Sequence, residues 1–339
     1  MPRHVSGGVV QGDLREHPAV RAWQSLVSAL HSPDSVQILK EYRAGIPGKS
    51  AVYRLTGVGH DGSPVIAKRC QRDAAFVERA IYRDLLPHLP VSHLRYYGFL
   101  EEPEGKICWL FLEDAEGDPY SAEVAEHCAA AGRWLGLLHT GAQDVETAIG
   151  LPGRGSHHYR SQLRSASRAI QDSLIKRALR IDDREVLLRI LSHFEELELQ
   201  WRQLDSLCGM MPSTLVHSDF SGKNIRLQTN HGEVEVLAFD WESAGWGFAA
   251  ADLAQSPPGL ERFSANPDIN AYWQVVREAW PGIARDELEQ LVQAGTLLRL
   301  LTAINWVASG LSFEWVRRPM AYLREYEASL SDALEAVKY

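Results

Sequence analysis

The residues with the clearest chemical potential lie in one stretch of the second half of the chain: Asp219, Asn224 and Asp240. Residues 225–228 alternate apolar and polar side chains and residues 234–239 return as a second strand, so the stretch predicts a β-hairpin. A hairpin would bring Asn224 and Asp240 to neighbouring strand ends, with Asp219 in the loop just before them. Carboxylate and carboxamide oxygens are hard donors that suit Mg²⁺ bridged to phosphates. One carboxylate would then be left to orient a nucleophile.

The sequence around these residues resembles a known catalytic loop. The spacing His-x-Asp-x-x-x-x-Asn over residues 217–224 fits the catalytic loop of kinases, and Asp240 falls where their second metal-binding Asp lies. Residues 217–225, His-Ser-Asp-Phe-Ser-Gly-Lys-Asn-Ile, and residues 239–254, which begin Phe-Asp-Trp-Glu and end Asp-Leu-Ala, resemble the aminoglycoside phosphotransferase and choline-kinase-like family. Two linked motifs in the expected order are a specific signal, whereas a lone His-x-Asp would be a weak one.

The same loop departs from the family pattern at positions beside the chemistry. Ser218 stands where the family commonly has Gly, and residues 221–223 stand where it has His-x-Gly. Lys223, next to Asn224, either adds positive charge near the phosphates or points to solvent. The departures leave the three metal and acceptor residues unchanged, so they bear on the substrate subgroup rather than on the reaction.

The resemblance implies an α+β, two-lobed protein-kinase-like fold. Its N-lobe would be a small antiparallel β-sheet plus a helix, and its larger C-lobe would be mainly helical and carry the catalytic β-hairpin. We therefore expect an N-terminal helical extension over 1–35, a nucleotide-binding N-lobe over 36–114, and a catalytic and substrate-binding C-lobe over 115–339. An amphipathic helix predicted at 14–31 either caps the small lobe or mediates self-association.

A lysine and a glutamate in the first third of the chain match the nucleotide-binding part of this fold. Lys68 lies in Val-Ile-Ala-Lys at the end of a predicted strand, and the resemblance implies that it contacts the α- and β-phosphates of ATP. Glu78, ten positions later on a predicted helix, would hold Lys68 in an ion pair. The alternative for Lys68 is an exposed strand lysine. The strands and the helix are predicted at 36–42, 50–55, 64–69 and 73–86.

Two loops complete the nucleotide site that the resemblance implies. The loop containing Gly45, Gly48 and Ser50 would cover the phosphates, since its flexible backbone can approach them. The adenine ring would dock on backbone groups of the hinge after a continuous apolar strand, where Glu113 and Ala115 lie. The nucleotide would be ATP, with GTP as the alternative.

Each catalytic-loop residue has a predicted role beside a structural alternative. Asp219 would be the base that orients the acceptor hydroxyl, against an Asx-type loop carboxylate. Asn224 and Asp240 would hold Mg²⁺, against strand-end caps. His217 is expected to bond the loop backbone rather than take part in catalysis. The resemblance implies that Asp252 ties the catalytic loop together, against a plain helix N-terminal carboxylate.

Two other glycine patterns are not nucleotide motifs. Residues 57–62 satisfy the Gly-x-Gly-x-x-Gly string, but a strand follows rather than a helix, which favours a hairpin turn. Residues 48–50 resemble the end of a Walker A loop, yet the earlier glycine that this loop requires would fall on Arg43.

The composition of the chain limits the classes of protein to which it can belong. The formal net charge of −9 and the pI of about 5.8 disfavour nucleic-acid binding. The four cysteines are scattered and predict free thiols in a reducing compartment. The chain starts with no apolar run of signal-peptide length, and the apolar segment 296–313 is interrupted by Arg299 and Asn305, so we expect a cytoplasmic protein with no membrane contact.

One basic segment has two interpretations. Residues 154–189 contain nine Arg or Lys against four Asp or Glu. Charged runs are usually solvated helix faces, which is the favoured interpretation. The second is an electropositive lip beside the acceptor site, which would argue mildly against polycationic aminoglycosides.

The sequence therefore predicts an ATP- and Mg²⁺-dependent phosphotransferase that acts on a hydroxyl of a small molecule of antibiotic, sugar or amino-alcohol type. The alternative is a nucleotide-binding pseudokinase or regulatory module of the same fold, which would not need Asp219. A protein kinase is disfavoured because Asp-Trp-Glu at 240–242 stands where Asp-Phe-Gly would be. The acceptor and any oligomeric partner are left open.

Overall fold

The computed structural model describes residues 8–10, 13–27, 32–40, 50–145, 150–176, 179–230, 232–312 and 317–337. Its contacts divide the chain into two compact units. The first contains residues 1–118 together with 237–243, and the second contains residues 119–236 and 244–339. The segment that carries Asp240 thus belongs to the first unit, although it follows the hairpin in sequence.

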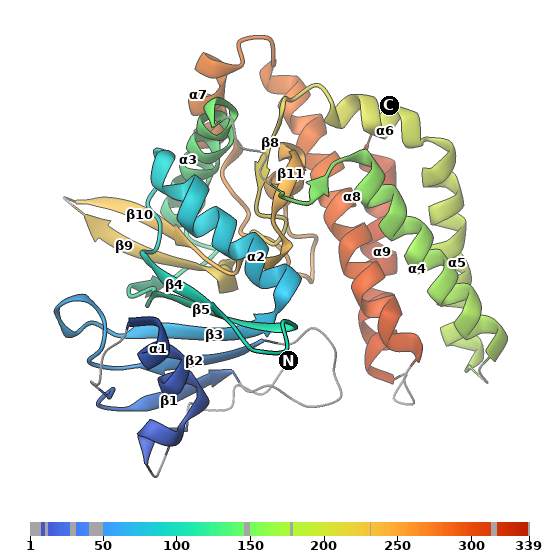
Figure 1. Cartoon of the computed structure of the whole chain (residues 1–339). Helices are drawn as coiled ribbons and strands as arrows, with labels where there is room; N and C mark the ends of the chain where they lie inside the picture. The colour runs from blue at the N-terminus through green and yellow to red at the C-terminus, as the bar shows by residue number, and fades with distance from the viewer. Residues whose placement is uncertain are drawn as a thin grey trace. The chain divides into compact units, whose positions relative to one another are not determined.

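The first unit contains an antiparallel five-stranded sheet with strand order β1-β2-β3-β5-β4 (Figure 1). Gly57 and Gly62, both at positive φ, lie in the connection between antiparallel strands β2 and β3, which confirms the hairpin interpretation of that loop. The strands are β1 Val36–Lys40, β2 Ala51–Leu55, β3 Val65–Gln71, β4 Tyr96–Glu101 and β5 Ile107–Glu113.

Neighbouring residues of a strand point to opposite faces of a sheet. Helices cover both faces of this sheet, so each set of alternate residues packs against a different helix. On β3, Val65 and Ala67 share a buried core with Trp23 of helix α1 (Pro18–Val27). The alternate residues face α2 (Arg72–Ala80), which continues as a π-helical turn over Ile81–Leu85 and a 3-10 turn over Leu86–His88. Helix α1 therefore packs on the small sheet, the first of the two roles predicted for it.

The second unit is mainly helical. Helix α8 lies at its centre and contacts α4, α6, α7, α9 and the 3-10 turn Ala249–Leu253. Gly295 of α8 permits this approach, since a Cβ atom there would lie 1.8 Å from the carbonyl oxygen of Ala250. The helices are α3 Ala125–Gly141, α4 Ser156–Lys176, α5 Ile181–Leu199, α6 Trp201–Cys208, α7 Ile269–Ala279, α8 Arg285–Ser309 and α9 Arg317–Ala336.

Helix α8 and the turn after it are as long and apolar as a membrane span. Among the described residues, Arg285–Ser312 meets this test by length and composition, although Arg299 and Asn305 interrupt its apolar run. Its burial indicates a different role, since 67% of its most apolar window lies inside the structure. A helix surrounded by other helices in this way is typical of the core of a globular unit.

Short strands in the second unit carry the catalytic loop. Strand β11 (Gly245–Phe248) pairs antiparallel with β8 (Ser213–Val216) and parallel with β7 (Gly153–Arg154). The predicted hairpin is present as β9 (Ile225–Asn230) and β10 (Glu233–Ala238), in a sheet of order β10-β9-β6, where β6 is Asp118–Pro119.

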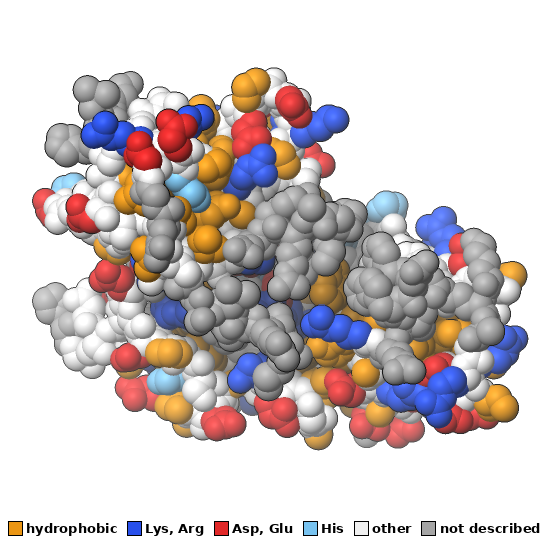
Figure 2. Space-filling view, turned by 90° about the horizontal axis from the view of Figure 1, so that it is seen from below, with side chains coloured by type: hydrophobic (Ala, Val, Ile, Leu, Met, Phe, Trp, Pro, Cys, Tyr) orange, Lys and Arg blue, Asp and Glu red, His pale blue; other side chains and the backbone are white. Residues whose placement is uncertain are grey.

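The basic segment 154–189 forms α4 and the first part of α5, and ion pairs neutralise part of its charge. Arg160 and Arg164 of α4 both bind Glu198 of α5, with nitrogen–oxygen distances of 2.6 Å. Arg189 binds Glu327 of α9 at 2.9 Å. Figure 2 shows Lys and Arg side chains interspersed with Asp and Glu over the face it presents. These pairs favour the interpretation as a solvated helix face.

Candidate active site

The predicted Lys68–Glu78 ion pair is confirmed in the first unit. Lys68 projects from β3 and its Nζ donates to Oε1 of Glu78 on α2 at 2.8 Å. The Lys68 side chain is 8% exposed and that of Glu78 is 1% exposed. A buried charge needs a partner of opposite charge, so each residue keeps the other in place.

Two further carboxylates meet the same ammonium group. Lys68 Nζ also donates to Oδ1 of Asp240 and lies 3.3 Å from Oε2 of Glu242. Asp240 and Glu242 flank Trp241, which is fully buried and anchors the segment. Asp240 has a φ of 70°, a left-handed conformation that non-glycine residues adopt infrequently and that clusters at functional sites. Glu242 is a further residue of this cluster that the sequence did not predict, although it lies only two positions after Asp240.

Burial and charge act on this cluster in opposite directions. Burial lowers the pKa of Lys68, but the carboxylates of Glu78, Asp240 and Glu242 outweigh it and raise this pKa well above its usual value. Burial raises the pKa of Glu78 to about 7, against the lowering effect of Lys68. Lys68 therefore stays protonated beside these carboxylates.

Carboxylate oxygens such as those of Asp240 are ligands that fit a divalent cation. Mg²⁺ is commonly bound by one or two carboxylates together with substrate phosphates and water, rather than by a complete protein cage. Among the described residues, no group of three or more His, Cys, Asp or Glu could hold a metal ion. The donor set predicted for Mg²⁺, Asp240 with Asn224, consists of the hard oxygen ligands that this ion prefers.

In the second unit, Asp252 shapes the catalytic loop. Its carboxylate accepts the backbone N–H of His217 at 2.6 Å and that of Ser218 at 2.8 Å. Ser218 has a φ of 61°, and these two bonds hold that uncommon conformation. The Nδ1 atom of His217 accepts the N–H of Asp219 at 3.3 Å. The predicted structural roles of His217 and Asp252 are confirmed.

We expect Asp252→Asn to destabilise the fold. An amide offers only one acceptor oxygen, so its NH₂ group would face a backbone N–H in a fully buried position. The cost of such an unsatisfied pair is about 2 kcal/mol in the free energy of unfolding. Denaturant unfolding would measure it, with Asp286→Asn on the exposed first turn of α8 as the control. Equal stability of the two variants would contradict this role.

Asp219 is held at both carboxylate oxygens. Its Oδ1 accepts from Arg299 of α8 at 2.7 Å, and its Oδ2 accepts from Lys223 at 2.8 Å and from Nδ2 of Asn224 at 3.0 Å. Burial raises the pKa of Asp219, but the charges and hydrogen bonds of Arg299 and Lys223 outweigh it and lower this pKa to about 2. Asp219 therefore stays ionised at any physiological pH.

Arg299 was not found by the sequence analysis, which treated it only as an interruption of an apolar segment. An arginine inside the apolar run of a core helix was nevertheless a signal, since a buried guanidinium requires acceptors. Its partner Asp219 is 80 positions earlier in the chain, beyond any spacing rule.

The structure describes three of the five other residues predicted for the nucleotide site. Gly45 and Gly48 lie outside the described residues. Ser50 is buried, and its hydroxyl accepts from Lys40 Nζ at 3.0 Å. Glu113 ends β5, and its backbone N–H donates to the carbonyl of Arg95 at 2.9 Å. Ala115, two residues later, is partly exposed.

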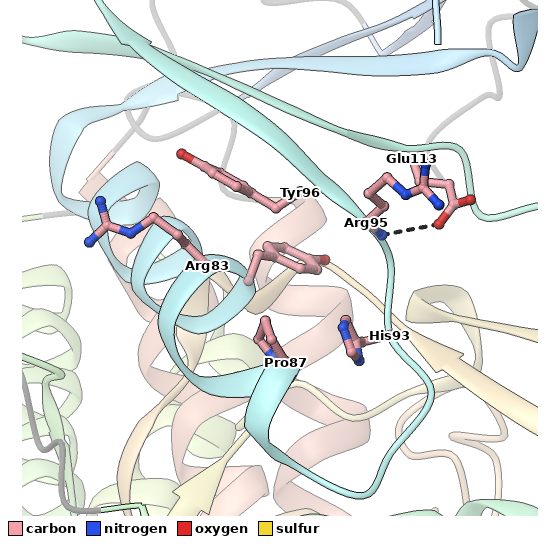
Figure 3. Close-up of a pocket in the computed structure, with 7 residues that line it drawn as sticks. Arg83, Pro87, His93, Arg95, Tyr96 and Glu113 are labelled. Atoms are coloured by element: carbon pink, nitrogen blue, oxygen red, sulfur yellow. Dashed lines mark hydrogen bonds between the residues drawn. The ribbon is translucent and has the colours of Figure 1, made fainter. Parts of the chain in front are cut away.

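A pocket of about 450 Å³ lies near this end of β5 (Figure 3). The Glu113 side chain turns toward the backbone N–H of Arg95 and accepts from it at 3.0 Å. Lys68 and Asp240 do not line this pocket, so it is distinct from the cluster around the ammonium group. Its lining residues are Tyr82, Arg83, Pro87, His93, Arg95, Tyr96 and Glu113.

The structure thus assembles the predicted site residues in two groups. Lys68, Glu78 and Asp240 meet in the first unit, and Asp219 and Asn224 meet in the second. A metal site shared by Asn224 and Asp240 would join residues of different units and stays a prediction.

The order and chemistry of these groups match a known family. The family model described as the phosphotransferase enzyme family (APH) matches residues 46–284. The chain belongs to this family. The match includes Lys68, Glu78, the catalytic loop and the Asp240 segment, and it ends just before α8, so Arg299 lies outside it. A comparison with curated protein sequences gives no match.

Solved structures with similar coordinates are small-molecule kinases. Choline kinase from Cryptosporidium parvum Iowa II is 14% identical with a TM-score of 0.55, over 88% of this chain and 90% of that chain. Plasmodium vivax ethanolamine kinase is 17% identical with a TM-score of 0.53, over 89% and 84%. An aminoglycoside phosphotransferase solved with GDP and kanamycin is 14% identical with a TM-score of 0.58, over 91% and 98%. These similarities confirm the predicted α+β, protein-kinase-like fold of this phosphotransferase.

Proposed function

We propose that this phosphotransferase transfers the γ-phosphate of ATP to a hydroxyl group of a small molecule, with Mg²⁺ as cofactor. The observation that carries the proposal is the Asp219 carboxylate, which is fixed in the catalytic loop at both oxygens and kept ionised. A carboxylate in this position can orient an acceptor hydroxyl, whereas a module that only binds nucleotide has no use for it.

The acceptor side of the reaction belongs to Asp219. The hydroxyl oxygen of the acceptor bonds to the γ-phosphorus while the bond from that phosphorus to the β–γ bridging oxygen breaks, and ADP leaves with the electron pair. The hydroxyl proton passes to Asp219. Because a carboxylate of pKa about 2 is a weak base, it accepts this proton late, and its main contribution is to orient the nucleophile.

The nucleotide side belongs to the first unit. We assign Lys68 to the α- and β-phosphates and Glu78 to holding Lys68 for them. Asn224 and Asp240 would hold Mg²⁺, which would neutralise phosphate charge when bound. At the hinge the backbone N–H of Glu113 is already bonded to Arg95, so we assign the adenine contact to the remaining backbone groups of Glu113 and Ala115. Gly45, Gly48 and Ser50 would form the phosphate-covering loop.

The relatives of this fold indicate a broad class of acceptor. Choline kinase and ethanolamine kinase are named for small alcohols, and a third relative was solved with kanamycin. We therefore propose a small hydroxylated acceptor of antibiotic, sugar or amino-alcohol type, in a soluble cytoplasmic enzyme. The kanamycin-bound relative was solved with GDP, so GTP is the second donor to test.

The direct test is nucleotide consumption with ATP or GTP and Mg²⁺ over a panel of hydroxylated metabolites and antibiotics. Turnover that requires an acceptor supports the proposal. Binding of Mg²⁺-nucleotide without turnover on any acceptor would favour the pseudokinase alternative instead.

We expect Lys68→Met to weaken Mg²⁺-ATP binding. Methionine keeps the unbranched shape and most of the length of the side chain but removes the ammonium group that we assign to the phosphates, and it leaves Glu78 buried without this partner. We expect the Kd for Mg²⁺-ATP to rise by about tenfold, or about 1.4 kcal/mol. Calorimetric titration would measure it, with Lys106→Met in the turn between β4 and β5 as the control. Equal affinities for the two variants would exclude Lys68 from the phosphate site.

A further inference from the structure

The least expected contact of the catalytic loop comes from helix α8. The Arg299 side chain leaves this helix among fully buried neighbours such as Leu298 and Leu300, and it is 12% exposed. Its Nη2 donates to Oδ1 of Asp219 at 2.7 Å, its Nη1 to the carbonyl of Ser218 at 3.2 Å, and its Nε to the carbonyl of Phe263 at 2.7 Å. All three nitrogen positions of the guanidinium are thus used.

These bonds define the position of Asp219 more strictly than a single ion pair would. The planar fork of an arginine fixes its acceptors in direction as well as distance. The guanidinium also lies 5.2 Å from the centre of the Phe263 ring, which holds its plane from one face. The rigid guanidinium of Arg299 therefore binds three parts of the unit at once: the Asp219 carboxylate, the Ser218 backbone and the segment before α7 that contains Phe263.

The two oxygens of Asp219 are held very differently. Oδ1 faces the buried Arg299, whereas Oδ2 faces Lys223, whose side chain is 66% exposed. An exposed lysine four residues away forms a weak pair that solvent and ligands displace easily. Nδ2 of Asn224 also donates to Oδ2 and to the Asp219 carbonyl, each at 3.0 Å, which turns the Asn224 amide nitrogen toward Asp219.

We propose that Arg299 is the positioning residue of the catalytic carboxylate: it binds Oδ1 permanently and so leaves Oδ2 as the oxygen that receives the acceptor hydroxyl when Lys223 moves away. The inference rests on the proposed function, because it assigns a role to Asp219 in that reaction. It concerns a residue outside the segment that matches the family and a contact that the motifs do not contain.

The test compares Arg299→Gln, Arg299→Lys and a matched control, Arg285→Gln. Arg285 also lies on α8 and also binds through its guanidinium, to Asn270 at 3.0 Å and to Glu289 at 3.0 Å, but neither partner belongs to the catalytic loop. We expect Arg299→Gln to lower kcat about 100-fold, as misplacement of a reacting group does, with the KM for ATP within about twofold of wild type. Arg285→Gln should leave both constants unchanged.

Arg299→Lys separates the shape of the guanidinium from its charge. Lysine keeps the charge but not the planar fork, so its kcat should lie below that of wild type and above that of Arg299→Gln.

A second measurement does not depend on turnover. The ¹³C resonance of the Asp219 carboxyl at pH 7, assigned by comparison with Asp219→Asn, should shift in Arg299→Gln and stay unchanged in Arg285→Gln. Absence of turnover on every acceptor would overturn the proposed function, while this shift would still decide the role of Arg299. An unshifted Asp219 resonance, or equal losses of kcat in Arg299→Gln and Arg285→Gln, would overturn the inference.

Discussion

Replacing Asp219 with Asn is expected to lower kcat by about 10³-fold, the range that a positioned acid–base group contributes. The amide can keep its oxygen toward Arg299, but its nitrogen has no lone pair to accept the acceptor hydroxyl. Because the group that we assign to the nucleotide phosphates is Lys68 and not Asp219, the Kd for Mg²⁺-ATP should stay within about twofold of wild type. Steady-state kinetics and calorimetric titration measure the two quantities.

The control is Asp332→Asn on the exposed side of α9, which removes one carboxylate from the same unit without touching the loop. Its kcat should equal that of the wild type. Retention of more than a tenth of wild-type kcat in Asp219→Asn would remove Asp219 from the acceptor role.

Asp240→Asn is expected to impair binding and turnover together. Asp240 is bonded to Lys68 and is also an assigned Mg²⁺ ligand, so its loss weakens the metal site and frees Lys68 to turn toward Glu242. We expect kcat/KM for ATP to fall at least about 100-fold, or about 2.7 kcal/mol of transition-state stabilisation. The concentration of Mg²⁺ needed for half-maximal rate should rise, and a Mg²⁺ titration of the initial rate measures this.

Glu242→Gln is the matched comparison, because Glu242 lies farther from Lys68, at 3.3 Å, and is about a third exposed. Its effect on kcat/KM should be several times smaller. A Mg²⁺ requirement that does not change in Asp240→Asn would contradict the assignment of Asp240 to the metal.

The contacts that the sequence predicted correctly follow from short-range rules. Lys68 and Glu78 could be paired because a strand followed directly by a helix brings residues ten positions apart to one face of the sheet. The role of Asp252 followed from its place in a motif. In each case the relative position of the residues followed either from the periodicity of a strand or helix, or from a spacing in the family's motif.

The contacts that the sequence did not predict depend on packing between distant segments. Arg299 reaches Asp219 only because α8 lies at the centre of the helical unit, and nothing near either residue specifies which helix is central. The choice between the two roles predicted for α1 is also made by packing, because Trp23 and the aromatic residues of β5 share one core. Which helices pack together depends on the complementarity of their whole surfaces, and this complementarity cannot be inferred from one sequence.

The close approach at Gly295 links the two supports of the catalytic loop. Gly295 presses against Ala250, two residues before Asp252, and Arg299 follows on α8 one turn later. The carboxylate that shapes the loop backbone and the guanidinium that aims its reacting side chain are therefore set by the same helix-to-turn distance. A single methyl group added at this point would displace both at once, so the reactivity of the loop is governed by a residue that carries no functional group at all.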